Sequence, residues 1–173
     1  MRTISAEEIT NAVQALATEI AKRHGDSPNI VLAGIANGGI PLNDWLFEEL
    51  KSKLSGSLSK GIVDISFHRD DFGQKPITKE VESTQLFHNP EDAIVILVDD
   101  VLHSGRTIRA ALAELHTIGR PEKIELAILV DRGNRRLPIT ADYVGIVTET
   151  KENETVNVHI DAADHSNSKI EIK

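Results

Sequence analysis

The chain of 173 residues has 27 acidic and 19 basic residues, a formal net charge of −8, 40% hydrophobic residues and no cysteine. The lack of cysteine excludes a disulfide scaffold, a zinc finger, an iron–sulfur site and a thiol nucleophile. The acidic balance disfavours nucleic-acid binding through a broad basic face, because phosphate contacts need positive potential. Neither a bilayer-spanning apolar run nor the apolar core of a signal peptide is found, so we expect a cytoplasmic protein with no membrane partner.

Apolar residues recur at helical spacing or in short continuous runs, and glycine and proline separate them. Ser5 with Glu8 forms a capping box that opens the first helix. From Phe72 to about Asn89 the chain is polar and unpatterned, which is typical of a long functional loop. In chain order we predict a helix over 6–23, a strand over 30–35, a helix over 41–54, strands over 62–67 and 93–98, a helix over 105–118, and strands over 124–130, 143–147, 156–160 and 170–172.

This alternation of strands and helices predicts an α/β fold whose central parallel sheet is flanked by helices with right-handed crossovers. No internal repeat or linker divides the chain, so we expect one domain over residues 1–173.

The stretch with the clearest chemistry follows the apolar strand at 93–98. Asp99 and Asp100 come at its carboxyl end, where open α/β sheets bind ligands. A loop of small residues then opens a helix, and backbone N–H groups at a helix N-terminus suit a phosphate. Two carboxylates beside a phosphate fit a ribose with vicinal hydroxyls. The plain alternative is that the acids cap the helix and Gly105 only turns the chain; a P-loop and a dinucleotide fingerprint are both absent.

Residues 95–107 (VILVDDVLHSGRT) resemble the phosphoribosyl-diphosphate signature of type I phosphoribosyltransferases. The pairs His68–Arg69 and Asp70–Asp71, together with residues 130–138 (VDRGNRRLP), are similar to the family of pyrimidine operon attenuation regulators, which are also uracil phosphoribosyltransferases. The resemblance extends over nearly the whole chain. It implies a type I phosphoribosyltransferase fold with a mobile hood loop at about residues 68–90.

The resemblance also implies substrates and roles for particular residues. Phosphoribosyl diphosphate and uracil would give UMP with Mg²⁺ as cofactor, in a homodimer or homotetramer, and no direct side-chain ligand of the metal is predicted. Asp99 and Asp100 would hold the ribose hydroxyls, and Arg69 would face the diphosphate beside Asp70 and Asp71. The 5′-phosphate would be bound by His103, Ser104, Gly105, Arg106 and Thr107. Asp131 and Arg132 would lie near the base and the magnesium-bound diphosphate, and Leu137, Pro138 and Ile139 would form the uracil pocket.

Residues 34–39 (GIANGG) stand where phosphoribosyltransferases have a diphosphate-binding loop. Many regulators carry Lys-Thr-Arg-Gly there, whereas this chain has Asn37, Gly38 and Gly39 and no basic side chain. Bare N–H groups can still bind diphosphate oxygens. A lost charge-assisted contact is typically worth about 2–4 kcal/mol, which predicts a slower enzyme. A simple strand-to-helix turn is the alternative.

Two other functions stay open at this stage. The first is a UMP-sensing, RNA-binding attenuation regulator with little or no catalysis. The acidic segment over 147–154 (VTETKENE) and the scarcity of basic residues in the first helix disfavour RNA, leaving Arg135 and Arg136 as candidates for a local basic patch. The second is a purine phosphoribosyltransferase, since Gly-Gly loops occur there too.

Overall fold

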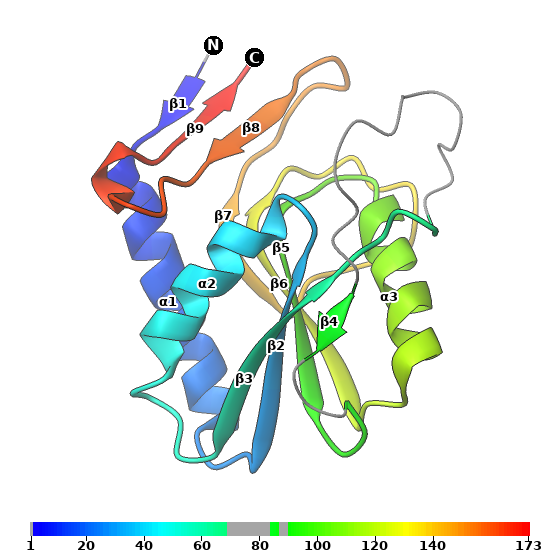
Figure 1. The fold of residues 1–173 in the computed structure, drawn as a ribbon. Coiled ribbons are helices and arrows are strands. Elements are labelled where there is room, and N and C mark those ends of the chain that lie inside the picture. The colour runs from blue at the N-terminus through cyan, green and yellow to red at the C-terminus, as the bar shows by residue number, and fades with distance from the viewer. Residues whose placement is uncertain (1, 69–83, 87–89) are drawn as a thin grey trace.

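A mostly parallel sheet forms the centre of the computed structural model, which describes residues 2–68, 84–86 and 90–173 (Figure 1). Among the described residues, the β3–β4 pair of this sheet is antiparallel and its other pairs are parallel. In spatial order its strands are β4 (Gln85–Leu86), β3 (Ser57–Val63), β2 (Asn29–Ile35), β5 (Ile94–Leu102), β6 (Lys123–Asp131) and β7 (Tyr143–Val147).

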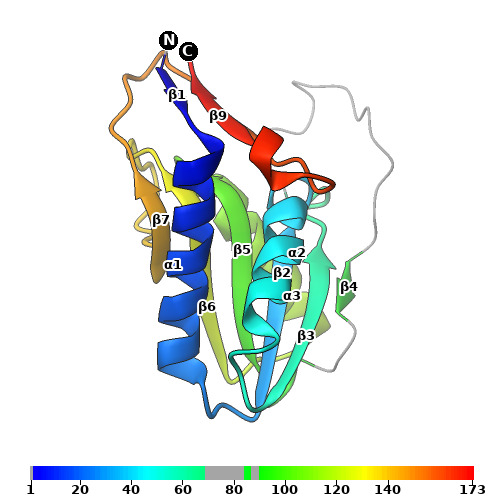
Figure 2. The same ribbon diagram turned by 90° about the vertical axis from the view of Figure 1, so that its left-hand side faces the viewer.

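Helices cover both faces of this sheet, as predicted. Figure 2 shows α1 (Ala6–His24) and α2 (Gly39–Leu50) on one face, with α3 (Arg106–Ile118) on the other. The predicted capping box begins α1, and the helix buries its apolar stripe against the sheet. Two apolar clusters result, one under α1 and α2 and one under α3. Burying both faces explains why the central strands read as continuous apolar runs.

A second, three-stranded antiparallel sheet has the order β1-β9-β8 and lies close to both termini. It consists of β1 (Arg2–Ile4), β9 (Lys169–Ile172) and β8 (Val156–His159). The short 3₁₀ helix His165–Asn167 ties it to α2, because the ring of His165 stacks on Trp45 with centroids 3.6 Å apart. The sequence predicts the last two strands but not β1, nor the separation into two sheets, since the strands that pair lie at opposite ends of the chain.

Two predicted elements lie elsewhere than the apolar pattern indicates. The strand expected over 62–67 is found as β3, Ser57–Val63, because its pairing with β2 begins at Asn29↔Ser57 and ends at Ile35↔Val63. Beyond Val63 the carboxylate of Asp64 accepts a hydrogen bond from the N–H of Ser66 and closes a turn. The helix expected over 41–54 begins and ends earlier, at Gly39 and Leu50.

A buried charged cluster joins α1, β6 and β7 at the amino ends of the strands. The side chain of Glu125 has no solvent exposure. It accepts hydrogen bonds from the Tyr143 hydroxyl at 2.5 Å and contacts His24 Nε2 at 2.7 Å. Lys123 and Arg23 complete the ion pairs. Burial acts to raise the pKa of Glu125, but the hydrogen bonds from Lys123, Tyr143 and His24 outweigh it and lower the pKa to about 2.

Candidate active site

The strand order places a topological switch point between β2 and β5. The chain runs from β2 through α2 to β3 on one side, and from β5 through α3 to β6 on the other. Open α/β sheets bind ligands in the crevice outside the carboxyl ends of strands at such a point. The glycine-rich loop at 36–39 follows β2, whereas the diacid lies near the carboxyl end of β5 and its loop follows that strand. The two motifs therefore meet because of the topology.

Asp99 and Asp100 are the last acidic residues of β5. The side chain of Asp99 is 5% exposed, and its Oδ1 accepts a hydrogen bond from the N–H of Asp100 at 3.0 Å. Burial raises the pKa of Asp99 well above its usual range, and the charge of Asp100 raises it further. Burial also raises the pKa of Asp100, which is partly exposed. Two adjacent carboxylates with raised pKa values near the carboxyl end of a sheet strand are typical of a functional site.

The glycine-rich loop packs directly on this diacid. A Cβ atom added to Gly38 would lie 2.6 Å from Oδ2 of Asp100. One added to Gly39 would lie 2.2 Å from the backbone oxygen of Val98 in β5. The peptide bond between Ala36 and Asn37 is cis, and Asn37 is exposed. Only glycine lets the loop approach this closely, so its composition is explained by the site as well as by the turn.

The loop at 103–107 leads from β5 into α3 through a left-handed residue. Gly105 has φ +90° and caps the helix without a side-chain acceptor. The hydroxyl of Ser104 accepts a hydrogen bond from the N–H of Arg106 at 3.3 Å, and Thr107 is exposed in the first turn. Burial lowers the pKa of His103, and the nearby arginines lower it further. The loop therefore forms a helix N-terminus of the kind that suits a phosphate, with the His103 imidazole beside it.

The segment from Asp131 to Ile139 is folded against this loop. A Cβ atom added to Gly105 would lie 3.3 Å from Leu137 Cβ and 3.2 Å from Ile139 Cδ1. The backbone N–H of Leu137 donates to the Ser104 oxygen at 3.1 Å. Leu137 and Ile139 are half-buried, with Pro138 exposed between them.

Arg135 fastens the same segment, a role that sequence reasoning missed. Its guanidinium donates to the backbone oxygens of Leu102, His103, Gly133 and Ile139 and to the carboxylate of Asp131. Asp131 also accepts from the N–H of Gly133 at 3.0 Å. No sequence signal marks this role, because most of the acceptors are backbone oxygens and two of them lie more than thirty positions away.

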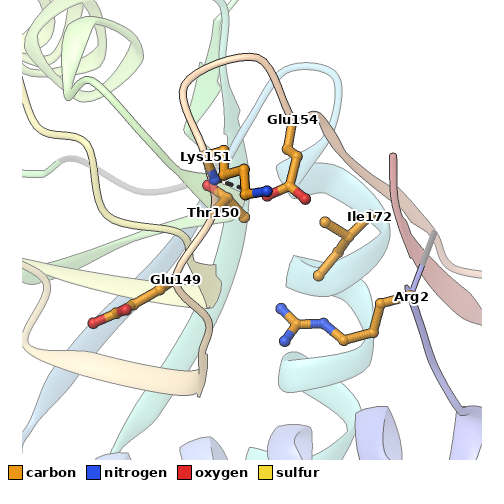
Figure 3. A pocket seen from close by; sticks show the side chains of 6 residues that line it. All are labelled: Arg2, Glu149, Thr150, Lys151, Glu154 and Ile172. Carbon is orange, nitrogen blue, oxygen red and sulfur yellow. Dashed lines mark hydrogen bonds between the residues drawn. The ribbon is translucent and has the colours of Figure 1, made fainter.

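Arg132 points its donors toward the segment that follows β7, where a cavity of about 450 Å³ is found. Figure 3 shows the side chains that line the cavity, from the 149–154 loop on one side and from β1 and β9 on the other. The lining residues are Arg2, Glu149, Thr150, Lys151, Glu154 and Ile172. This volume falls within the range of small-molecule sites.

The structure thus brings together Asn37, Gly38 and Gly39 with the diacid, and His103–Thr107 with Leu137 and Ile139. Arg69, Asp70 and Asp71 lie outside the described residues, as does most of the predicted hood loop.

In the part of the chain that is described, no group of three His, Asp or Glu side chains suits a metal ion, and no helix is long and apolar enough to cross a membrane. Mg²⁺ usually keeps several waters and is held through one or two carboxylates and substrate phosphates. The partly exposed carboxylate of Asp100 fits this kind of site, whereas both carboxylate oxygens of Asp131 are already engaged by Gly133 N–H and Arg135.

Comparison with known proteins agrees with this geometry. The sequence model of the phosphoribosyl transferase domain family matches residues 5–165 of this chain. The chain belongs to the phosphoribosyltransferase family. The protein named Bifunctional protein PyrR from Deinococcus radiodurans is 42% identical over 161 residues, covering 93% of this chain and 88% of the relative. A protein of the same name from Clostridioides difficile is 40% identical over 152 residues, covering 88% and 86%.

Solved phosphoribosyltransferases share the fold. The hypoxanthine phosphoribosyltransferase of Trypanosoma cruzi matches with a TM-score of 0.66 and 21% identity, over 88% of this chain and 82% of the other. That of Staphylococcus aureus matches with a TM-score of 0.65 and 22% identity, over 84% and 75%. The predicted fold class and the prediction of a phosphoribosyltransferase similar to the pyrimidine regulators are therefore confirmed.

Proposed function

We propose that this phosphoribosyltransferase transfers the phosphoribosyl group of phosphoribosyl diphosphate to uracil, giving UMP and diphosphate, with Mg²⁺ as cofactor. The observation that carries the proposal is the Asp99–Asp100 pair at the switch point of the sheet, in which Asp99 is buried and Asp100 packs against Gly38. The choice of uracil is supported by the likeness to relatives named Bifunctional protein PyrR, together with the pyrimidine-regulator motifs at 130–138.

The diacid would act on the ribose. Asp99 and Asp100 accept hydrogen bonds from its two hydroxyls and thereby hold the ring above the end of β5. The bond between ribose C1 and the diphosphate oxygen breaks, a bond to uracil N1 forms, and the N1 proton leaves to solvent. The positive charge that develops on the ring lies beside two carboxylates in a site of low polarity, where electrostatic stabilisation is strong.

Two loops would hold the phosphates. His103, Ser104, Gly105, Arg106 and Thr107 bind the 5′-phosphate through backbone N–H groups and hydroxyls at the start of α3. Asn37, Gly38 and Gly39 bind the diphosphate through backbone N–H groups. When bound, Mg²⁺ supplies positive charge that neutralises the diphosphate as it leaves. Asp100 would offer a carboxylate to its hydration shell.

The base would lie beyond the ribose, along the ends of β6 and β7. Leu137, Pro138 and Ile139 form one wall of its pocket, and Asp131 and Arg132 lie at its edge. Arg69, Asp70 and Asp71 remain predicted groups for the diphosphate. A homodimer or homotetramer in the cytoplasm completes the proposal, and light scattering during gel filtration measures the oligomeric state.

The decisive experiment offers phosphoribosyl diphosphate and Mg²⁺ with uracil, hypoxanthine, guanine or xanthine. UMP formation that is lost in Asp99→Asn/Asp100→Asn supports the proposal. No UMP from folded protein at saturating donor and Mg²⁺ refutes it. Turnover of a purine without uracil turnover assigns the chain to the purine enzymes instead.

A second candidate is a UMP-sensing regulator that binds RNA, which the word "bifunctional" in the relatives' name favours. The charges on the described surface count against it. The guanidinium of Arg135 donates to backbone oxygens, and Arg136 forms an ion pair with Glu152. This function predicts binding to a pyrimidine-operon leader that is strengthened by UMP and weakened by salt. Absence of binding at low salt disposes of it.

A further inference from the structure

A buried arginine holds the loop that follows β7. Only 6% of Arg132 is exposed. Its Nε donates to the hydroxyl of Thr150 at 2.9 Å, and Nη2 donates to the backbone oxygens of Lys151 at 3.3 Å and Glu154 at 2.5 Å. The Thr150 hydroxyl donates in return to the backbone oxygen of Arg132 at 3.2 Å. One guanidinium thus joins three points of the loop, which its planar array of donors suits.

The same residue is joined to the end of β5. The backbone N–H of Arg132 donates to the oxygen of Leu102 at 3.1 Å, two residues beyond Asp100. Two further bonds join the end of β6 and the residues after it to the segment that follows β7. Thr148 N–H donates to the Asp131 oxygen at 2.9 Å, and Asn134 Nδ2 donates to the Thr150 oxygen at 2.8 Å. The position of the loop relative to the diacid therefore depends on Arg132 and its neighbours.

The loop begins two strands away from the end of β5, which carries the diacid. Leu102, Asp131 and Val147 are consecutive partners across β5, β6 and β7. Neighbouring strands are about 4.8 Å apart, so the loop begins about 10 Å from the end of β5. The cavity beside it is lined by a hydroxyl, an ammonium, a guanidinium and carboxylates (Figure 3). A planar ring with alternating amide donors and acceptors is the kind of ligand that such a mixed lining suits.

We propose that Arg132 is a positioning residue for the nucleobase: it orders the loop at 149–154 as the wall on the base side of the nucleotide. The proposal rests on the proposed function for the identity of the ligand. It differs from a contact between Arg132 and the diphosphate, because the donors named above are directed to the loop. It predicts that loss of Arg132 weakens binding of the base and spares binding of the ribose phosphate.

The test compares two ligands by calorimetry, UMP and ribose 5-phosphate, which lacks the base. Arg132→Gln should weaken UMP binding about 10- to 100-fold, the usual effect of losing buried hydrogen bonds to a charged group. The affinity for ribose 5-phosphate should stay within about threefold. Hydrogen exchange of the amides at 149–154 should become faster. In turnover assays KM for uracil should rise while KM for the donor does not.

Matched variants separate positioning from a loss of folding. Arg136→Gln removes a neighbouring cation that is exposed and pairs with Glu152 of the same loop, and it should bind both ligands as the unmodified protein does. Thr150→Val removes a single partner of Arg132 and should weaken UMP alone, by about three- to tenfold; it serves if Arg132→Gln does not fold. Equal weakening of both ligands, or of neither, overturns the proposal. If the unmodified protein binds ribose 5-phosphate and UMP equally, the proposed function fails instead.

Discussion

Gly38 and Gly39 offer a sharp test of the site, because the same substitution should mainly lower activity at Gly38 and mainly lower stability at Gly39. Gly38 has φ −63° and ψ −35°, which alanine adopts without strain. The added Cβ would lie 2.6 Å from Oδ2 and 2.7 Å from Cγ of Asp100, so the carboxylate must swing aside. Moving a side chain about 30° from its rotamer costs about 0.5–1.5 kcal/mol. Alanine also stabilises the folded state by about 0.4–1 kcal/mol, because it restricts the conformations of the unfolded chain. The two effects are of similar size, so the free energy of unfolding should hardly change.

Activity should change far more than stability. Displacing a catalytic group by about 1 Å can cost about 100-fold in rate, so Gly38→Ala should lower kcat/KM by about 10- to 100-fold. In Gly39→Ala the new Cβ meets the backbone oxygen of Val98 at 2.2 Å, and a central strand cannot swing aside. That variant should lose about 1–3 kcal/mol of stability or more.

The assay is thermal unfolding together with UMP formation for both variants and the unmodified protein. Gly38→Ala with full activity would show that the loop does not control the position of Asp100. Equal losses of Tm in the two variants would show that the difference between a movable carboxylate and a fixed backbone oxygen has no consequence.

Three further predictions concern stability. The pKa of Asp99 is raised in the folded state, so ionisation of this carboxyl lowers stability as pH rises through that pKa. Asp99→Asn should therefore raise Tm at pH 7.5, by about 2–4 °C for each kcal/mol of stability gained, and should raise it less at pH 4. A gain in Tm that does not change with pH would contradict this prediction. The pKa of Glu125 is lowered to about 2, so its contribution is present above the unfolded pKa of about 4.3 and is lost as pH falls toward 2. Chemical denaturation of Glu125→Gln should show a deficit of up to about 3 kcal/mol at pH 7 that narrows below pH 4, and an equal deficit at both pH values would refute the role of its charge. Gly105 has φ +90°, so Gly105→Ala should cost about 1–2 kcal/mol in urea denaturation, and unchanged stability would mean that the loop relaxes freely.

Most elements of the sheet could be predicted because a strand that is buried on both faces has a continuous run of apolar residues in the sequence. The apolar run at 30–35 falls within β2, the run at 93–98 begins one residue before β5, and the helical spacing after Ser5 predicts α1 to within one residue. β3 was misplaced because its pairing with β2, and not its own apolar residues, sets its ends. Ser57, Ser59 and Lys60 are strand residues only because β2 supplies hydrogen-bond partners.

For the candidate site, the sequence by itself determined which groups are candidates for the chemistry, because a strand, two acids, a glycine loop and a helix are contiguous and each residue type has a local physical reason. Tertiary structure alone decided which groups meet. The close approach of Gly38 to Asp100 depends on the neighbouring positions of β2 and β5 in the sheet. The burial of Arg132 and the bonds of Arg135 to backbone oxygens depend on loops far apart in the chain. Every residue has the same backbone carbonyl, so no sequence pattern could have identified which carbonyl oxygens accept hydrogen bonds from these arginines.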